Sequence, residues 1–350
     1  MSLINELENL RNYFERGATL SADFRIEQLK KLKQSILEYE DELYQALYTD
    51  LKKNKEETWV TETGMVISEL NTALRKIKSW MRPEKVRTNL LNLPSSSRIL
   101  REPLGVVLII GPWNYPFQLL INPLIGAIAA GNCVVLKPSE FAPATDVVMK
   151  KIIESVFPKE YILYVQGEGQ QVIPQMMNAF RFDHVFYTGS TAVGKIIYKM
   201  AAEKVVPVTL ELGGKSPCVV DADANLKVAA RRIAMTKFSN AGQMCVAPDY
   251  VLVHQSVKQP FVDAMQETIH QFFGDKPEEN YNYGKMISEK QFDRVVKYLS
   301  EGNIIKGGRI DRAKLFIEPS LLDNIAPDAA VMQDEIFGPV LPILTFADMK

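Results

Sequence analysis

From Leu104 onward, short apolar runs alternate with stretches of helical character, and this alternation limits the chain to few folds. The run 105–110 is continuously apolar, which is typical of a strand buried on both faces of a sheet. Further strands are expected at 132–136, 162–166 and 183–187, and helices at 116–130, 144–156 and 192–202. Alternating strands and helices predict a parallel, doubly wound α/β sheet. Such sheets bind ligands at the carboxyl ends of their strands, so functional residues should follow strands.

The same alternation repeats beyond Gly213, with strands at 217–220 and 250–254 and helices at 226–238 and 259–273. A chain of 350 residues is also too long for one simple core. We therefore expect one α/β domain over 1–82 and 104–210, and a second over 211–350. Amphipathic helices at 21–51 and 57–81 belong to the first domain.

Residues 83–103 change character, because Asn, Ser and Pro punctuate the stretch. This composition is typical of a hairpin that leaves the main body. Hairpins of this kind often serve oligomer contacts. A plain surface loop is the alternative interpretation.

Composition excludes several classes of protein. The net charge of −1 gives no reason to expect nucleic acid or an acidic membrane surface as a partner. No apolar run approaches the roughly 20 residues of a membrane span, and the N-terminus lacks the apolar core of a signal peptide. Three cysteines in so long a chain do not make a disulfide framework and indicate a reducing compartment. A cytoplasmic location is the expectation.

A cysteine and a glutamate stand at the ends of apolar elements. Cys245 lies in a loop of small and polar residues, between a helix and the strand 250–254. Glu211 ends an apolar strand just before a Gly-Gly turn. A thiol and a carboxylate in such places are a plausible nucleophile and base. Cys133 and Cys218 sit in apolar strands and are expected to be structural.

Three further loops follow predicted strands. Asn114 sits between two prolines, where a rigid amide is a good donor to an oxyanion, although a turn role is the stronger interpretation for it alone. Lys137 and Glu140 could hold ribose hydroxyls. Gly189 and Gly194 bracket the start of a helix whose amides can face phosphate. Each of these signals is weak by itself.

The histidines show no metal-binding pattern. His184, His254 and His270 have no ligand spacing, so no metal is expected. A Cys–His protease pairing stays open in principle, but nothing places a histidine near Cys245.

Taken together, these loops make the chain closely resemble the aldehyde dehydrogenase superfamily. Six stretches carry the resemblance in family order: Gly-Pro-Trp-Asn-Tyr-Pro-Phe at 111–117, Leu-Lys-Pro-Ser-Glu at 136–140, Thr-Gly-Ser-Thr-Ala-Val-Gly-Lys at 188–195, Leu-Glu-Leu-Gly-Gly-Lys-Ser-Pro at 210–217, Gly-Gln-Met-Cys at 242–245 and Glu-Ile-Phe-Gly-Pro-Val at 335–340. The Asn-Tyr-Pro version of the first motif and the Ala-Pro-Asp-Tyr after Cys245 look like the class 3, fatty-aldehyde-type branch.

The resemblance implies a reaction and a role for each matching residue. Cys245 attacks the aldehyde as thiolate, its backbone amide and Asn114 stabilise the oxyanion, and Glu211 activates the water that releases the acid. Apolar neighbours of Glu211 should desolvate it and bring its pKa near neutrality. The first domain becomes a Rossmann-type NAD(P)-binding domain, the second the catalytic domain, and 83–103 the oligomerisation hairpin of a homodimer. The implied cofactor-binding residues are Lys137, Glu140, Gly189, Ser190, Thr191, Ala192, Val193, Gly194, Leu212, Glu335 and Phe337.

Some features leave alternatives open. Glu140 favours NAD because a carboxylate should repel a 2′-phosphate, while NADP stays open. Met244 and Ala192 stand where relatives more often carry Thr and Glu. Relatives also continue well past the chain's last motif, so the chain looks C-terminally truncated and its catalytic domain incomplete. The resemblance implies an enzyme that oxidises apolar aliphatic or aromatic aldehydes to carboxylic acids. The alternative hypotheses are a CoA-acylating aldehyde dehydrogenase and an inactive fragment that only binds cofactor.

Overall fold

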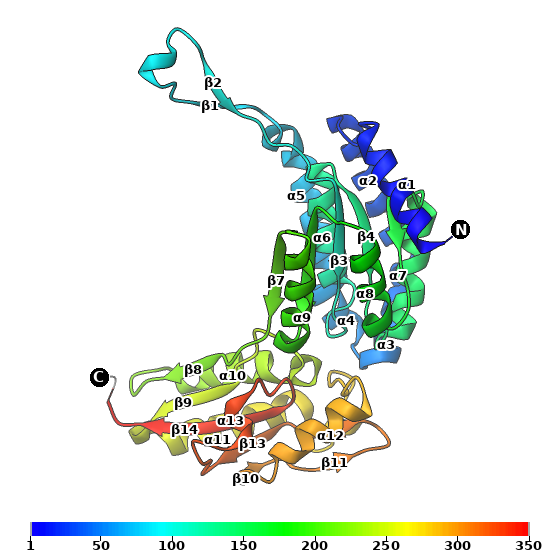
Figure 1. Cartoon of the computed structure of the whole chain (residues 1–350). Helices are drawn as coiled ribbons and strands as arrows, with labels where there is room; N and C mark the ends of the chain where they lie inside the picture. Colours follow the sequence, from blue (N-terminus) through cyan, green and yellow to red (C-terminus); the bar gives the residue numbers. More distant parts are fainter. Residues whose placement is uncertain (1, 349–350) are drawn as a thin grey trace. The chain divides into compact units, whose positions relative to one another are not determined.

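The chain forms two compact units in a computed structural model that describes residues 2–348 (Figure 1). The first unit comprises the residues up to Leu43 together with Thr58–Glu211. The second unit comprises Tyr44–Glu57 and the residues from Leu212 onward. Each unit is built around its own five-stranded sheet.

The sheet of the first unit has the strand order β5-β4-β3-β6-β7. Its strands are β3 (Val106–Ile110), β4 (Cys133–Lys137), β5 (Ile162–Tyr164), β6 (His184–Gly189) and β7 (Val208–Leu212). β3 pairs in parallel with both β4 and β6, and every residue of β3 and β4 is buried. The continuous apolar run therefore forms the centre of the sheet, and the predicted doubly wound α/β fold is confirmed.

Helices connect the strands and cover the sheet of the first unit. The helices between its strands are α6 (Gln118–Ala130), α7 (Pro143–Val156), α8 (Gly169–Ala179) and α9 (Thr191–Glu203). To this unit the N-terminal region supplies α1 (Leu3–Glu15), α2 (Ala22–Glu38), a π-helical turn (Trp59–Thr63) and α5 (Gly64–Trp80). α2 packs on α6 and α7, and α5 packs on α6, because each presents a buried apolar stripe.

A two-stranded hairpin follows α5. β1 (Glu84–Val86) pairs antiparallel with β2 (Ser97–Ile99), and a 3₁₀ turn (Leu90–Asn92) lies between them. Apolar side chains of the turn face solvent, with Leu90 82% and Leu91 91% exposed. The segment expected to form a hairpin therefore does so, with leucines outward.

The sheet of the second unit has the strand order β10-β13-β14-β9-β8. Its strands are β8 (Pro217–Val220), β9 (Tyr250–His254), β10 (Asn303–Lys306), β13 (Ser320–Asp323) and β14 (Val340–Phe346), and a separate pair is formed by β11 (Ile310–Asp311) and β12 (Phe316–Ile317). All neighbours in the five-stranded sheet are parallel except β10 and β13. The helices of this unit are α10 (Leu226–Phe238), α11 (Lys258–Phe273), α12 (Glu289–Tyr298) and α13 (Ala330–Gln333).

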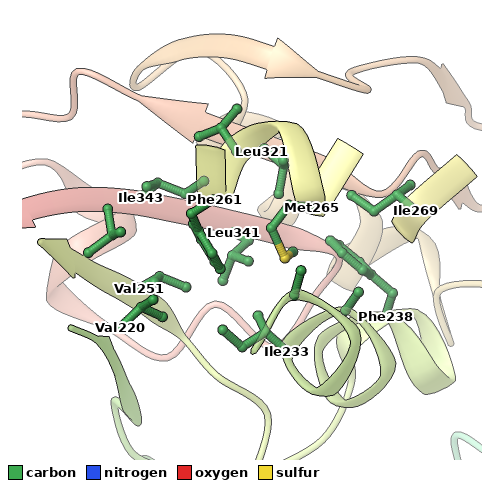
Figure 2. Packing of buried hydrophobic residues seen from close by; sticks show 14 of the residues in the cluster. Val220, Ile233, Phe238, Val251, Phe261, Met265, Ile269, Leu321, Leu341 and Ile343 are labelled. Carbon is green, nitrogen blue, oxygen red and sulfur yellow. The ribbon is translucent and has the colours of Figure 1, made fainter. Parts of the chain in front are cut away.

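The core of the second unit lies between its sheet and the helices α10 and α11 (Figure 2). Phe261 and Met265 of α11 meet Val251 of β9 and Ile343 of β14 there. Phe238 is fully buried in the same cluster. Because Phe238 ends α10, this packing fixes the point where the Cys245 loop begins.

The structure differs from the expected division in the segment 44–57. This segment, which includes the end of α3 (Glu40–Leu51), belongs to the second unit. The physical reason is a set of hydrogen bonds with distant residues of that unit: Lys285 N donates to Leu51 O at 3.1 Å, and Lys52 Nζ donates to Glu278 O at 3.0 Å. These contacts are long-range, so local periodicity does not report them.

The helix expected over 21–51 is also two helices. α2 ends at Glu38, and the φ of −96° and ψ of 12° at the next residue, Tyr39, break the regular helix before α3 begins. Within residues 2–348, no helix is both long and apolar enough to cross a membrane.

Candidate active site

Candidate residues of the first unit gather at one edge of its sheet. Asn114 follows β3, Lys137 and Glu140 lie at and after the end of β4, and Gly189 ends β6. β3 lies between β4 and β6, and its pairings with both are parallel. The carboxyl ends of these strands therefore meet at the same edge, at the point where the strand order reverses, which is where such sheets bind ligands.

The Asn114 loop is fixed at both ends. Asn114 is 4% exposed and lies between Pro112 and Pro116, which restrict the backbone. After the loop, the N–H of Gln118 donates to the fully buried carboxylate of Glu62 at 2.8 Å. That bond satisfies one of the amides at the start of α6 and holds the loop against the π-helical turn.

Lys137 and Glu140 form a preset pair at the end of β4. Lys137 is 1% exposed, and its ammonium donates to Glu140 Oε2 at 3.1 Å. Glu140 Oε1 accepts from the N–H of Gly169 at 2.9 Å. Burial opposes ionisation of Glu140, but the Gly169 and Glu140 backbone N–H groups and Lys137 lower its pKa below the ordinary value. Glu140 is thus an ionised acceptor suited to hydroxyl groups.

The start of α9 offers backbone amides to an anion. Ser190 caps this helix, and its side chain accepts from the N–H of Val193 at 3.4 Å. Ser190, Thr191, Ala192 and Val193 are exposed, whereas Gly194 is buried. The first amides of a helix have no partner within it and lie at the positive end of its dipole. Glu140 follows β4 at the same edge of the sheet. Together, these groups are the donors and acceptors that a dinucleotide's phosphates and ribose need.

Glu211 lies on β7, and its surroundings correct one expectation. Glu211 is exposed, whereas Leu210 and Leu212 are half-buried. Successive side chains of a strand point to opposite faces, so the two leucines lie on the other side of β7 from the carboxylate. The expectation that they desolvate Glu211 is therefore wrong.

In the second unit, the loop that carries Cys245 is strained. It leaves α10 through a 3₁₀ turn (Ser239–Gly242), in which Asn240 and Ala241 have φ of 49° and 50°. Gly242 has φ of 74°, and a Cβ there would overlap the carbonyl oxygen of Gly338. Left-handed conformations at non-glycine residues cluster at functional sites, where the surrounding structure holds them in place.

Gln243 holds this loop from within. Its side chain is fully buried and donates through Nε2 to Asn240 O and to Lys285 O, both at 2.9 Å. Its Oε1 accepts from the N–H of Ile287 at 3.0 Å. Two residues before Cys245, the nucleophile candidate, the loop is therefore tied both to itself and to residues 285–287.

The three thiols differ sharply in environment. Cys245 is exposed, Cys218 is half-buried, and Cys133 is buried in β4. Burial raises the pKa of Cys133 to about 12 and also raises the pKa of Cys218. Only the thiolate is a nucleophile, so burial disfavours reaction at both strand cysteines, which agrees with the structural role expected for them.

Glu335 lies against the turn that follows β7. It is half-buried, and a Cβ at Gly213 would overlap its carboxylate. Burial and the nearby charge of Asp249 raise the pKa of Glu335 to about 7, against the opposing effects of the Gly214 N–H, Lys237 and Arg294. Glu335 therefore changes charge near neutral pH.

Phe337 and Leu212 complete the candidates of the second unit. Both side chains are half-buried, and Phe337 has a φ of 47°. Asn114, Lys137, Glu140, the residues 189–194 and Glu211 thus belong to the first unit, and Leu212, Cys245, Glu335 and Phe337 to the second.

Sequence reasoning missed four charged residues around these positions. Asp249 and Lys237 are 3% and 1% exposed, Lys215 forms an ion pair with Asp249, and Glu62 holds the start of α6. Burial lowers the pKa of Lys237 to about 8, although Asp249 raises it. Lys215 follows the Gly-Gly turn and Asp249 follows Cys245 by four residues, so proximity to the motifs was the available signal.

Among residues 2–348, no group of three or more His, Cys, Asp or Glu side chains is arranged to hold a metal ion. The candidate residues instead offer amides, carboxylates, the Lys137 ammonium and one exposed thiol.

Solved structures share this fold over almost the whole chain. Staphylococcus aureus AldH in a substrate-bound state is similar with a TM-score of 0.96 and 45% identity, covering 100% of this chain and 76% of that one. An indole-3-acetaldehyde dehydrogenase of P. syringae, solved in complex with NAD+, has a TM-score of 0.89 and 28% identity, covering 98% and 71%.

Curated relatives point the same way. The 4,4'-diaponeurosporen-aldehyde dehydrogenase of Staphylococcus aureus is 47% identical over 96% of this chain and 73% of its own length. Aldehyde dehydrogenase family 3 member B1 of Rattus norvegicus is 42% identical over 99% of this chain and 74% of its own length. The model of the aldehyde dehydrogenase family matches residues 6–350. The chain therefore belongs to the aldehyde dehydrogenase family, in its class 3 branch, and is an enzyme that oxidises aldehydes.

Proposed function

We propose that this enzyme oxidises apolar aliphatic or aromatic aldehydes to carboxylic acids with NAD, through a covalent intermediate on Cys245. The observation that carries the proposal is the contrast between the thiols: Cys245 is exposed on a loop held by Gln243, and the other two are in strands with raised pKa values. An accessible thiol on a fixed loop is the arrangement that nucleophilic catalysis requires.

In the proposed reaction, Cys245 Sγ forms a bond to the carbonyl carbon, and the carbonyl oxygen becomes an oxyanion. The Asn114 amide and the backbone N–H of Cys245 donate to that oxyanion. A bound nicotinamide cofactor would supply a hydride acceptor, and loss of hydride from this carbon would leave Cys245 joined to the acyl group as a thioester. Glu211 then takes a proton from water, the water oxygen attacks the thioester, and the thiolate leaves as the acid is released.

The fit of the strand ends supports the cofactor assignment. Lys137 and Glu140 would hold the adenosine ribose, and the exposed first turn of α9, from Ser190 to Gly194, would face the pyrophosphate. Leu212, Glu335 and Phe337 would contact the nicotinamide end, with Glu335 on its ribose. The lowered pKa of Glu140 keeps this group anionic, which disfavours a 2′-phosphate and so favours NAD over NADP.

The substrate class rests on the class 3 relationship and on Trp113. Trp113 is half-buried beside Asn114. Tyr115 and Phe117 are 6% and 0% exposed, so these two aromatic side chains belong to the core and do not offer a lining. Substrate preference is therefore expected to respond to Trp113 and not to Phe117.

The proposed partner is a second copy of the chain. The exposed leucines of the hairpin are apolar groups that a homodimer contact would bury. Within residues 83–103, the segment expected to make the oligomer contact, these leucines are the proposed contact residues.

A single-turnover mixing experiment tests the chemistry. The purified chain is mixed with excess NAD and a medium-chain aldehyde, and reduced nicotinamide is followed in time. The wild type and Cys218→Ser should give a burst, and Cys245→Ser should give none. A burst of equal amplitude in Cys245→Ser would refute the assignment of the nucleophile.

The fate of the acyl group separates hydrolysis from CoA acylation. With Glu211→Gln, the burst should persist while acid release slows, and intact-protein mass spectrometry should detect the acyl-enzyme. Acid release by the wild type without CoA is expected. A product that forms only when CoA is added would favour the acylating alternative.

A further inference from the structure

The segment that carries Glu335 is held by side chains from other parts of the second unit. Lys215 Nζ donates to Val331 O at 3.0 Å and to Asp334 O at 3.1 Å. Arg294 donates to Ile336 O at 2.8 Å. The short helix α13 ends at Gln333, and residues 334–336 lie in no helix or strand, so these bonds help to fix the backbone there.

Asp249 links this segment to two other loops. Its Oδ1 accepts from the N–H of Ile336 at 2.8 Å, and its Oδ2 forms an ion pair with Lys215. Its own N–H donates to Ser216 O at 2.8 Å. One carboxylate residue, 3% exposed, therefore connects the turn after β7, the end of the Cys245 loop and the Glu335 segment.

Lys215 and Asp249 depend on each other. A carboxylate buried to this degree is costly unless a cation and hydrogen-bond donors satisfy it. The ammonium of Lys215 is only partly exposed, and it reaches two carbonyl oxygens as well as Asp249. Removal of Lys215 therefore releases contacts before Glu335, and removal of Asp249 releases the contact after it.

We propose that Lys215 and Asp249 are a positioning pair, which sets the location and the charge of Glu335 and thereby the affinity for the nicotinamide cofactor. The carboxylate lies against Gly213, where a Cβ would overlap it, so a small shift of the 331–336 backbone changes its place. The proposal rests on the proposed assignment of Glu335 to the cofactor ribose.

The charge of Glu335 depends on this arrangement. The charged groups that act on Glu335 are Asp249, Lys237 and Arg294. Asp249 raises the pKa of Glu335, second only to burial, whereas Lys237 and Arg294 lower it. Neutralising Asp249 should therefore lower the pKa of Glu335 and leave it ionised to a lower pH.

The test measures NAD affinity of the whole chain by titration calorimetry between pH 5.5 and 8.5. Lys215→Met should weaken NAD binding at pH 8 about ten-fold, because a displacement of a binding group by a fraction of an ångström has effects of this order. Asp249→Asn should shift the midpoint of the pH dependence to lower pH. Lys215→Arg keeps the charge and should leave that midpoint in place while weakening binding.

Controls separate this role from general destabilisation. Lys258→Met breaks a comparable ion pair with Asp323, at 2.7 Å in the same unit, and should change neither NAD affinity nor the midpoint. Melting temperatures of all variants report folding. If Lys215→Met does not fold, Asp249→Asn still carries the test, because a purely structural role would not move the pH midpoint. Lys215→Arg then tests the position alone, through weaker binding at an unchanged midpoint.

Glu335→Gln distinguishes the two ways of failing. If Glu335→Gln binds NAD as the wild type does at every pH, the ribose assignment itself is wrong. If Glu335→Gln weakens binding but Lys215→Met and Asp249→Asn keep both wild-type affinity and midpoint, the ribose assignment stands and the positioning pair is refuted.

Discussion

Asn114, the proposed oxyanion donor, is held in place by its surroundings. It is buried, flanked by two prolines and followed by a helix start that Glu62 holds. A donor fixed in this way needs no reorganisation when charge develops on the substrate oxygen.

Asn114→Ala should therefore lower the rate of the burst by roughly 10²- to 10³-fold, the usual effect of losing one oxyanion donor. NAD affinity should be unchanged, because Asn114 is assigned to the reacting oxygen. Stopped-flow measurement of reduced nicotinamide checks the rate, with the exposed Asn178→Ala as control. A loss of less than three-fold would contradict the oxyanion role.

Glu335 should make cofactor binding depend on pH near neutrality. Its pKa is raised to about 7, so it is ionised above that pH and neutral below it. Ribose hydroxyls donate more strongly to an ionised carboxylate, so NAD affinity should fall about five-fold as pH drops from 8 to 6. Titration calorimetry across this range measures it. Glu335→Gln should give a flat profile, and a wild-type profile that is already flat would refute the prediction.

Residues that follow strands were predictable, and their surroundings were not. Asn114, Lys137 and Glu140 were found because parallel strands place their carboxyl ends together. Leu210 and Leu212 were expected to desolvate Glu211 because they are its neighbours in sequence. In a strand, however, adjacent side chains point to opposite faces, so Glu211 is exposed. The pairing of Lys215 with Asp249 joins residues far apart in the chain, so only the folded unit reveals it.

At the scale of elements, the turn between α10 and Cys245 depends on glycine at one position. Gly242 combines a φ of 74° with a backbone carbonyl in the space that a side chain would take. A backbone atom cannot move aside as the end of a flexible side chain can.

Gly242→Ala should destabilise the enzyme by at least roughly 1–3 kcal/mol from backbone strain, and should displace the loop that carries Cys245. Gly126→Ala is the matched control, because Gly126 lies inside α6 with open space around it. That change should be neutral or stabilise by about 0.5–1 kcal/mol. Urea unfolding of both variants checks the difference, and equal midpoints would contradict it.

Sequence periodicity located most helices and strands, but it failed where tertiary packing determines the bounds of an element. The break at Tyr39 occurs at a residue that is compatible with a helix, so nothing local signals it. α8 was not anticipated, and it contains Pro174. α12 was overlooked although Ser288 caps it and Phe292 and Val295 mark its buried face, so a signal was present there.

At the scale of the whole molecule, the hairpin should control self-association. Leu90 and Leu91 are among its most exposed apolar side chains, and a partner would bury them. If the proposed homodimer forms through this hairpin, replacing both with Asp should shift the mass from dimer to monomer in size-exclusion chromatography with light scattering. Val205→Asp, at a residue 83% exposed elsewhere in the first unit, should leave the dimer intact. An unchanged mass for the double variant would contradict the assignment.

The unequal environments of the three thiols also bear on how the enzyme responds to oxidants. Peroxides react with thiolates, and burial raises the pKa of Cys133 to about 12 and also raises the pKa of Cys218, which disfavours the thiolate form of both. Mild oxidation should therefore modify one sulfur per chain, and activity should fall in proportion to that single modification. The first oxidation product of Cys245 is expected to be a sulfenic acid that added thiols can reverse.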